Sequence, residues 1–141
     1  MGINIINQYS DEKYGIVKII LDDPLYEDDS TKLIIILDKL LSIKKPFIII
    51  VDLEKLKKLP VNAMTCLKNW MINSKELIKQ YLICSVIIIK DNIVNNVVKK
   101  MIETLFLFTK PTRPNKISSN QEKCDVWMNE QLNLYIKERS L

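Results

Sequence analysis

The pattern of apolar positions predicts two strands that are buried on both faces. Residues 45–53 (KPFIIIVDL) and 81–90 (YLICSVIIIK) are short, nearly all-apolar runs rich in β-branched side chains. Strands covered by helices on both sides of a parallel sheet have this pattern, because neither face meets water. A helical pattern of about thirty residues separates the two runs, as in a βαβ unit. We therefore expect an α/β protein.

Three further segments have the pattern of strands. Residues 3–9 and 14–21 are predicted to pair as a hairpin through the polar connection at 10–13, and residues 115–117 form a short last strand. The expected sheet is mixed and mostly parallel, with about five strands and an antiparallel N-terminal pair.

About four helices are expected between and after the strands. Short polar side chains suit the start of three of them, because they accept hydrogen bonds from free backbone N–H groups, and Pro60 suits the first turn of the fourth. Ser119 and Glu122 together have the spacing of a capping box. The helices are predicted from Ser30 to about residue 43, from Val61 to about residue 79 with a break at Asn73 and Ser74, from Asp91 or Asn92 to about residue 108, and after Ser119.

Composition narrows the chemistry. The 141 residues fit a single domain over 1–141, and 48% of them are hydrophobic. There is no histidine, which excludes His-activated nucleophiles and His-containing zinc sites. The two glycines, Gly2 and Gly15, do not lie at a strand-to-helix turn, so a glycine-rich phosphate loop is excluded. We expect no cofactor and no enzymatic activity.

The cysteines and the N-terminal residues indicate in which cellular compartment the protein lies. Cys66, Cys84 and Cys124 are far apart and have apolar neighbours, which is typical of buried thiols in a reducing environment. The N-terminal residues lack the pattern of a signal peptide, and no apolar run is long enough to span a bilayer. We expect a cytoplasmic protein without a membrane span.

The net charge of +4 is unevenly placed, with acidic residues at 22–29 and lysines at 44–45 and 55–58. Charges collect at the exposed ends of strands, which explains the uneven distribution without a charged partner. The lysines lack interleaved aromatic residues, so we expect no nucleic-acid partner. Asp22, Asp23, Asp28 and Asp29 suit Mg²⁺ by residue type, but no positioning partner accompanies them. We therefore predict that these residues do not form a metal site.

Three polar residues are candidates for a ligand site at the carboxyl edge of the sheet. Asp52 ends the first buried strand, at the edge where open α/β folds bind ligands. Asn62 and Asn92 begin helices at the same predicted edge, where amides favour an anion. All three residues are equally suited to capping the next turn.

Several strings resemble the STAS domain of anti-sigma-factor antagonists, their stand-alone relatives and the cytoplasmic tails of sulfate transporters. Val51-Asp52-Leu53 and the strand at 81–90 resemble its central strands. Residues 113–119 (RPNKISS), followed by Cys124 and Trp127-Met128, resemble its last strand, serine turn and closing helix. The resemblance covers about residues 1–135 in element order and implies a STAS-like fold.

The resemblance also implies a non-enzymatic regulatory module that binds a protein partner or itself. Regulatory members carry a phosphorylated serine at the start of the helix after the buried strand. The stretch here has no serine, acidic residue or glycine, so the switch is not intact, and Thr65 is the nearest hydroxyl. The implied partner-binding residues are Leu59, Pro60, Val61, Asn62 and Met64.

A second function stays open: binding of a small apolar ligand or lipid. The helix expected near residues 93–108 has more apolar surface than one sheet face requires. That excess favours either an apolar ligand or cover on more than one side of the helix.

Overall fold

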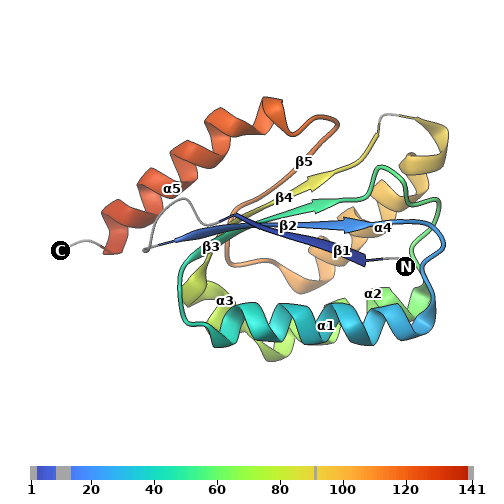
Figure 1. The fold of residues 1–141 in the computed structure, drawn as a ribbon, viewed down its shortest axis with the longest axis horizontal. Helices are drawn as coiled ribbons and strands as arrows, with labels where there is room; N and C mark the ends of the chain where they lie inside the picture. Colours follow the sequence, from blue (N-terminus) through green and yellow to red (C-terminus); the bar gives the residue numbers. More distant parts are fainter. Residues whose placement is uncertain (1–2, 9–13, 91, 140–141) are drawn as a thin grey trace.

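The computed structural model describes residues 3–8, 14–90 and 92–139. Its strands form one sheet in the order β1-β2-β3-β4-β5, in which β1 is antiparallel to β2 and the other neighbours are parallel (Figure 1). The strands are β1 (Ile3–Gln8), β2 (Gly15–Leu21), β3 (Phe47–Asp52), β4 (Leu82–Ile88) and β5 (Asn115–Ser118). The predicted fold class is confirmed. The connection expected at 10–13 lies outside the described residues.

Helices cover both faces of the sheet. Figure 1 shows α1 to α4 beneath one face and α5 on the other. They are α1 (Glu27–Ser42), α2 (Val61–Asn73), α3 (Lys75–Tyr81), α4 (Ile93–Thr109) and α5 (Asp125–Arg139), and a 3₁₀ turn, η1 (Glu122–Cys124), precedes α5. The break predicted at Asn73 and Ser74 is confirmed. It divides one expected helix into α2 and α3, so the described chain has five α-helices.

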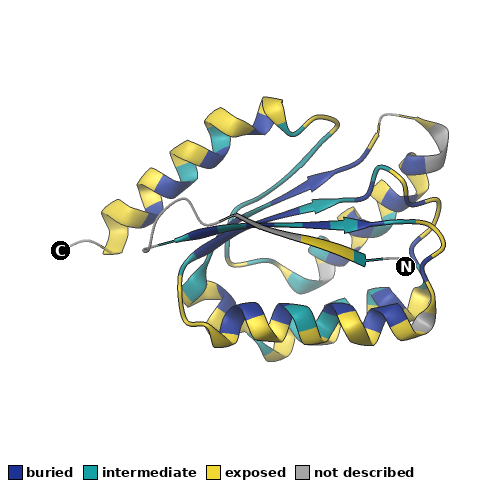
Figure 2. Ribbon diagram, viewed as in Figure 1, coloured by how far each residue is buried: buried dark blue, intermediate teal, exposed yellow. Residues whose placement is uncertain are grey.

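The two central strands are buried on both faces, as their sequence predicts (Figure 2). Ile49 of β3 packs in the cluster between the sheet and α1 to α4. Ile48 and Ile50 pack in the cluster on the other face, beneath α5. Because alternate residues of a strand point to opposite faces, this division follows directly from the apolar run. Cys84 and Cys124 are both buried in the cluster beneath α5.

Two predicted caps are wrong by a few residues. Helix α1 begins at Glu27, ahead of Ser30, because the Asp29 carboxylate accepts the backbone N–H of Tyr26 at 2.8 Å. At the last helix, Asn120 Oδ1 accepts the backbone N–H of Glu122 at 2.7 Å, a role that the sequence assigned to Ser119. At both helix starts, neighbouring short polar side chains are able to accept a hydrogen bond from the same backbone N–H, so the sequence alone does not decide which of them does.

Helix α4 is covered on one side. Val98, Ile102 and Leu105 are buried, whereas Val97 is 56% exposed and Leu107 is 75% exposed. The expectation that packing covers α4 on more than one side is therefore wrong for its described side chains. None of the described helices is both long enough and apolar enough to cross a membrane.

Candidate functional site: an apolar cavity beneath the sheet

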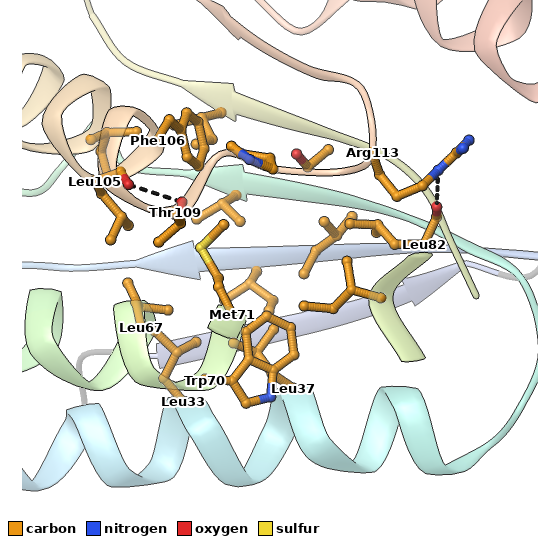
Figure 3. A pocket seen from close by; sticks show the side chains of 18 of the residues that line it. Leu33, Leu37, Leu67, Trp70, Met71, Leu82, Leu105, Phe106, Thr109 and Arg113 are labelled. Carbon is orange, nitrogen blue, oxygen red and sulfur yellow. Dashed lines mark hydrogen bonds between the residues drawn. The ribbon is translucent and has the colours of Figure 1, made fainter. Parts of the chain in front are cut away.

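A cavity of about 150 Å³ lies between the sheet and the helices beneath it (Figure 3). Its walls are almost entirely apolar. The sheet contributes Ile19, Ile49 and Ile87, and the helices contribute Leu37 from α1, Leu67 from α2 and Phe106 from α4, among others. A concave, mostly apolar space of this kind is the usual form of a small-molecule site.

Trp70 fixes one wall of the cavity. Its indole Nε1–H donates a hydrogen bond to Asp38 Oδ1 of α1 at 2.8 Å. In Figure 3 the ring lies beside Leu37, and Met71 points from α2 toward the sheet. The polar bond joins α1 to α2 at the protein surface, so the apolar part of the Trp70 ring is held against the cavity.

The charged residues of the described lining are basic. Lys75 begins α3, and Lys110 caps the end of α4 in the left-handed conformation, with φ of 46°. Both lysines are exposed and line the cavity, so the cavity reaches solvent beside them. The described lining residues include no aspartate, glutamate, cysteine or histidine.

Arg113 also lines the cavity, and its guanidinium is already bound. Its Nε donates to the carbonyl of Leu82 at 2.8 Å and its Nη2 to the carbonyl of Ile83 at 3.0 Å. Burial lowers the pKa of Arg113 from its ordinary value, and the nearby Arg139 lowers it further. Arg113 is therefore held to the start of β4.

The residues predicted at the carboxyl edge lie outside the cavity wall. Asp52 Oδ1 accepts the backbone N–H of Glu54 at 2.9 Å, and its Oδ2 lies 3.9 Å from Lys18 Nζ. Asn92 caps α4 by accepting the backbone N–H of Asn95 at 2.9 Å. These two residues make the capping contacts that the sequence equally allowed, and the structure does not bring them together with the cavity.

The segment predicted to bind a partner is only partly exposed. Leu59 is 4% exposed and lines the cavity, while Met64 packs half-buried against the core. Pro60 is half-buried, whereas Val61 is 78% exposed and Asn62 is exposed. Leu59, which the resemblance places among the partner-binding residues, is therefore buried and not exposed to a partner. Leu53, Leu56 and Leu59 are all buried, so the loop after β3 folds inward instead of standing clear of the core.

The nearest hydroxyl, Thr65, is exposed on α2. Its Oγ1 donates to the carbonyl of Val61 one turn earlier, at 3.3 Å, and Thr65 is not among the residues that line the cavity. Cys66, one residue on, is half-exposed, and its Sγ lies 3.9 Å from Asn62 Oδ1. These contacts are local to the first turns of α2 and do not assemble a site.

A residue that the sequence analysis missed is Asn95. It is 2% exposed, and its side chain binds two loops: Oδ1 accepts the backbone N–H of Lys90 at 2.8 Å, and Nδ2 donates to the carbonyl of Leu56 at 2.9 Å. The sequence contains a signal for this role, because Asn95 lies three residues after the cap Asn92 and, together with Asn96, interrupts a run of Ile and Val. It holds the loop that carries Leu59 against α4.

The acidic residues near α1 make local contacts. Asp22 Oδ2 accepts Asn4 Nδ2–H at 3.0 Å, Asp23 Oδ1 accepts the backbone N–H of Lys57 at 3.3 Å, and Asp29 caps α1. Within the described ranges, no three acidic, cysteine or histidine side chains gather in a way that could hold a metal ion.

Comparison with protein-family models, with curated proteins and with solved structures finds no match for this chain. The class of the protein is therefore set by its geometry: a mixed α/β sheet between two helical layers, with an apolar cavity on one side. The resemblance to the STAS domain stays a prediction.

Proposed function

We propose that this protein binds a small apolar molecule in the cavity between its sheet and helices α1 to α4. The observation that carries the proposal is the cavity itself, about 150 Å³ of space walled by aliphatic and aromatic side chains. An apolar cavity of similar size in another protein stays dry and accepts benzene. Water gains few hydrogen bonds in such a space, so an apolar guest is favoured over water.

The size of the cavity sets the expected affinity. Burying one CH₂ group contributes about 0.8 kcal/mol, so a six-carbon guest gains about 5 kcal/mol. Ordering the guest offsets part of this gain, which leaves about 4 kcal/mol and gives a Kd of about 1 mM for a minimal probe.

The lining supports the binding of a ligand without a chemical reaction. The described wall has no carboxylate, imidazole or thiol to act as a base or nucleophile. Its hydroxyl groups include that of Thr109, which donates to the carbonyl of Leu105 at 2.9 Å.

Toluene is the probe for this proposal, and methyl NMR is the measurement. We expect toluene to shift the methyl signals of Leu37 and Leu67 and to leave those of Leu132, beneath α5, in place. Leu67→Phe fills the cavity and should weaken binding at least about tenfold. The matched control is Ile16→Phe, a half-buried position packed against the cluster beneath α5, which should bind as the native chain does. Shifts at Leu132 equal to those at Leu37 would refute the proposal.

Partner binding through the segment from Leu59 to Met64 stays a second prediction. Val61 and Asn62 are its exposed residues. Val61→Asp tests it without disturbing the core, and an unchanged set of co-purifying proteins would count against this surface.

A further inference from the structure

We infer that the ligand is an amphiphile, with an anionic head held by Lys75 and Lys110 and a short apolar tail in the cavity. This inference rests on the proposed apolar-ligand function and adds the charge and orientation of the ligand. It is carried by the composition of the lining, which is almost entirely apolar and whose charged residues are all basic.

The sign of the charge is uniform along the lining. The charged residues of the described lining are Lys75, Lys110 and Arg113, and the lining has no acidic residue to oppose them. Lys75 comes from the start of α3 and Lys110 caps the end of α4, and both residues line the cavity. An anionic group at the lining therefore meets only positive side chains, whereas a cation is repelled by them.

The two lysines are available to a ligand, while Arg113 is not. Within the described part of the chain, neither Lys75 Nζ nor Lys110 Nζ lies within 4.0 Å of a carboxylate oxygen. Arg113, in contrast, already donates hydrogen bonds to the carbonyls of Leu82 and Ile83. The lysines therefore supply the head-group contact.

The exposure of both lysines favours an amphiphile over a fully buried anion. A carboxylate or phosphate beside these lysines keeps much of its hydration, so it avoids the large cost of transfer into an apolar interior. The tail then follows the apolar wall inward past Phe106 and Leu67.

The test compares four probes with the same six-carbon chain: hexanoate, hexyl phosphate, 1-hexanol and hexylamine. Affinities are measured at pH 7 and low ionic strength from the methyl shifts of Leu37 and Leu67. Two ion pairs at exposed lysines predict that the anionic probes bind about fivefold more tightly than 1-hexanol. Hexylamine should bind more weakly than 1-hexanol, and added salt should remove the differences. A preference between hexanoate and hexyl phosphate tells a carboxylate from a phosphate head, and either order supports the inference.

The lysines are then replaced in pairs. Lys75→Gln combined with Lys110→Gln should bring hexanoate to the affinity of 1-hexanol and leave toluene binding unchanged. The matched control is Lys99→Gln combined with Lys100→Gln, two exposed α4 lysines that do not line the cavity and whose loss should preserve the preference.

The outcomes separate the two proposals. Equal affinity for hexanoate and 1-hexanol, or a preference that survives loss of Lys75 and Lys110, would overturn the inference about charge and leave the cavity as the site. Failure of toluene and of all four hexyl probes to bind would overturn the proposed function itself.

Discussion

Arg113 joins the sheet to α5 through contacts that a single side chain provides. Its guanidinium holds the carbonyls of Leu82 and Ile83 and lies 5.4 Å from the centre of the Tyr135 ring. Arg139 lies over the same ring at 3.7 Å and donates to the carbonyl of Lys79 at 3.0 Å, while the Tyr135 hydroxyl donates to the carbonyl of Gln80. The carbonyls of Lys79 and Gln80 at the end of α3 lack helical partners, so Arg139 and Tyr135 of α5 satisfy them, while Arg113 satisfies two carbonyls at the start of β4.

Cys84 lies close to this group, and its burial has a consequence for stability. Burial raises the pKa of the Cys84 thiol from 9.0 to about 12, against a smaller lowering by Arg113 and a further raising by Cys124. Below about pH 9 the thiol is neutral in the folded and the unfolded chain, so its contribution to stability is fully present. Between about pH 9 and 12 the unfolded chain loses the proton first, so stability falls as pH rises.

We therefore predict that the free energy of unfolding decreases from pH 8.5 to pH 10.5 and that Cys84→Ala reduces this slope. The thiol contributes up to about 1.4 kcal/mol per pH unit in that range. Burial also raises the pKa of Tyr135, so some slope remains in the variant. Urea unfolding at each pH is the measurement. Ser85→Ala, the next position on β4, removes no thiol and should keep the native slope; an equally steep slope in Cys84→Ala would contradict the assignment.

At the scale of elements, α4 and the loop after β3 are joined through Asn95. The loop buries Leu53, Leu56 and Leu59, and the Leu56 carbonyl has its partner in Asn95 Nδ2. The Lys90 backbone N–H after β4 binds Asn95 Oδ1. One buried amide therefore fixes how the loop, the end of β4 and the start of α4 fit together beside the cavity.

Asn95→Ala should lower the free energy of unfolding by about 2–4 kcal/mol, because it leaves a part-buried backbone N–H and a buried carbonyl without their partners. Asn96→Ala, at the neighbouring exposed position, should change it by less than about 0.5 kcal/mol. Urea unfolding of the two variants makes the comparison. Equal stability of the two would mean that water replaces the amide and that the loop is held by its leucines alone.

The order of the elements could be predicted because burial on both faces leaves an unmistakable pattern in β3 and β4. The break between α2 and α3 was also visible, since Asn73 and Ser74 interrupt the apolar face. The caps of α1 and α5 were less certain from sequence, because adjacent short polar side chains suit the same backbone N–H. The burial of Leu59 depends on the hydrogen bond between Asn95 and the loop after β3. Asn95 lies 36 positions further along the chain than Leu59, so a local sequence pattern does not reveal this contact.

At the scale of the whole molecule, the cavity is a property of packing that no single segment encodes. Its lining comes from β2, β3, β4, all four helices on that face and the connection from α4 to β5. Most of those residues have the sequence pattern of ordinary core, so no local pattern marks the space between them. The sequence indicates an apolar ligand as a second function, from the wide apolar face of α4. It predicts candidate polar residues at the carboxyl edge, whereas the basic residues that line the cavity are Lys75, Lys110 and Arg113.

The most direct measurement of the central claim is a crystal structure of the full chain under xenon pressure, because xenon enters apolar cavities without needing a polar partner. We predict a xenon peak in the anomalous difference map between Leu37, Leu67 and Phe106. Filled side-chain density there, with no xenon between these three residues, would contradict the account.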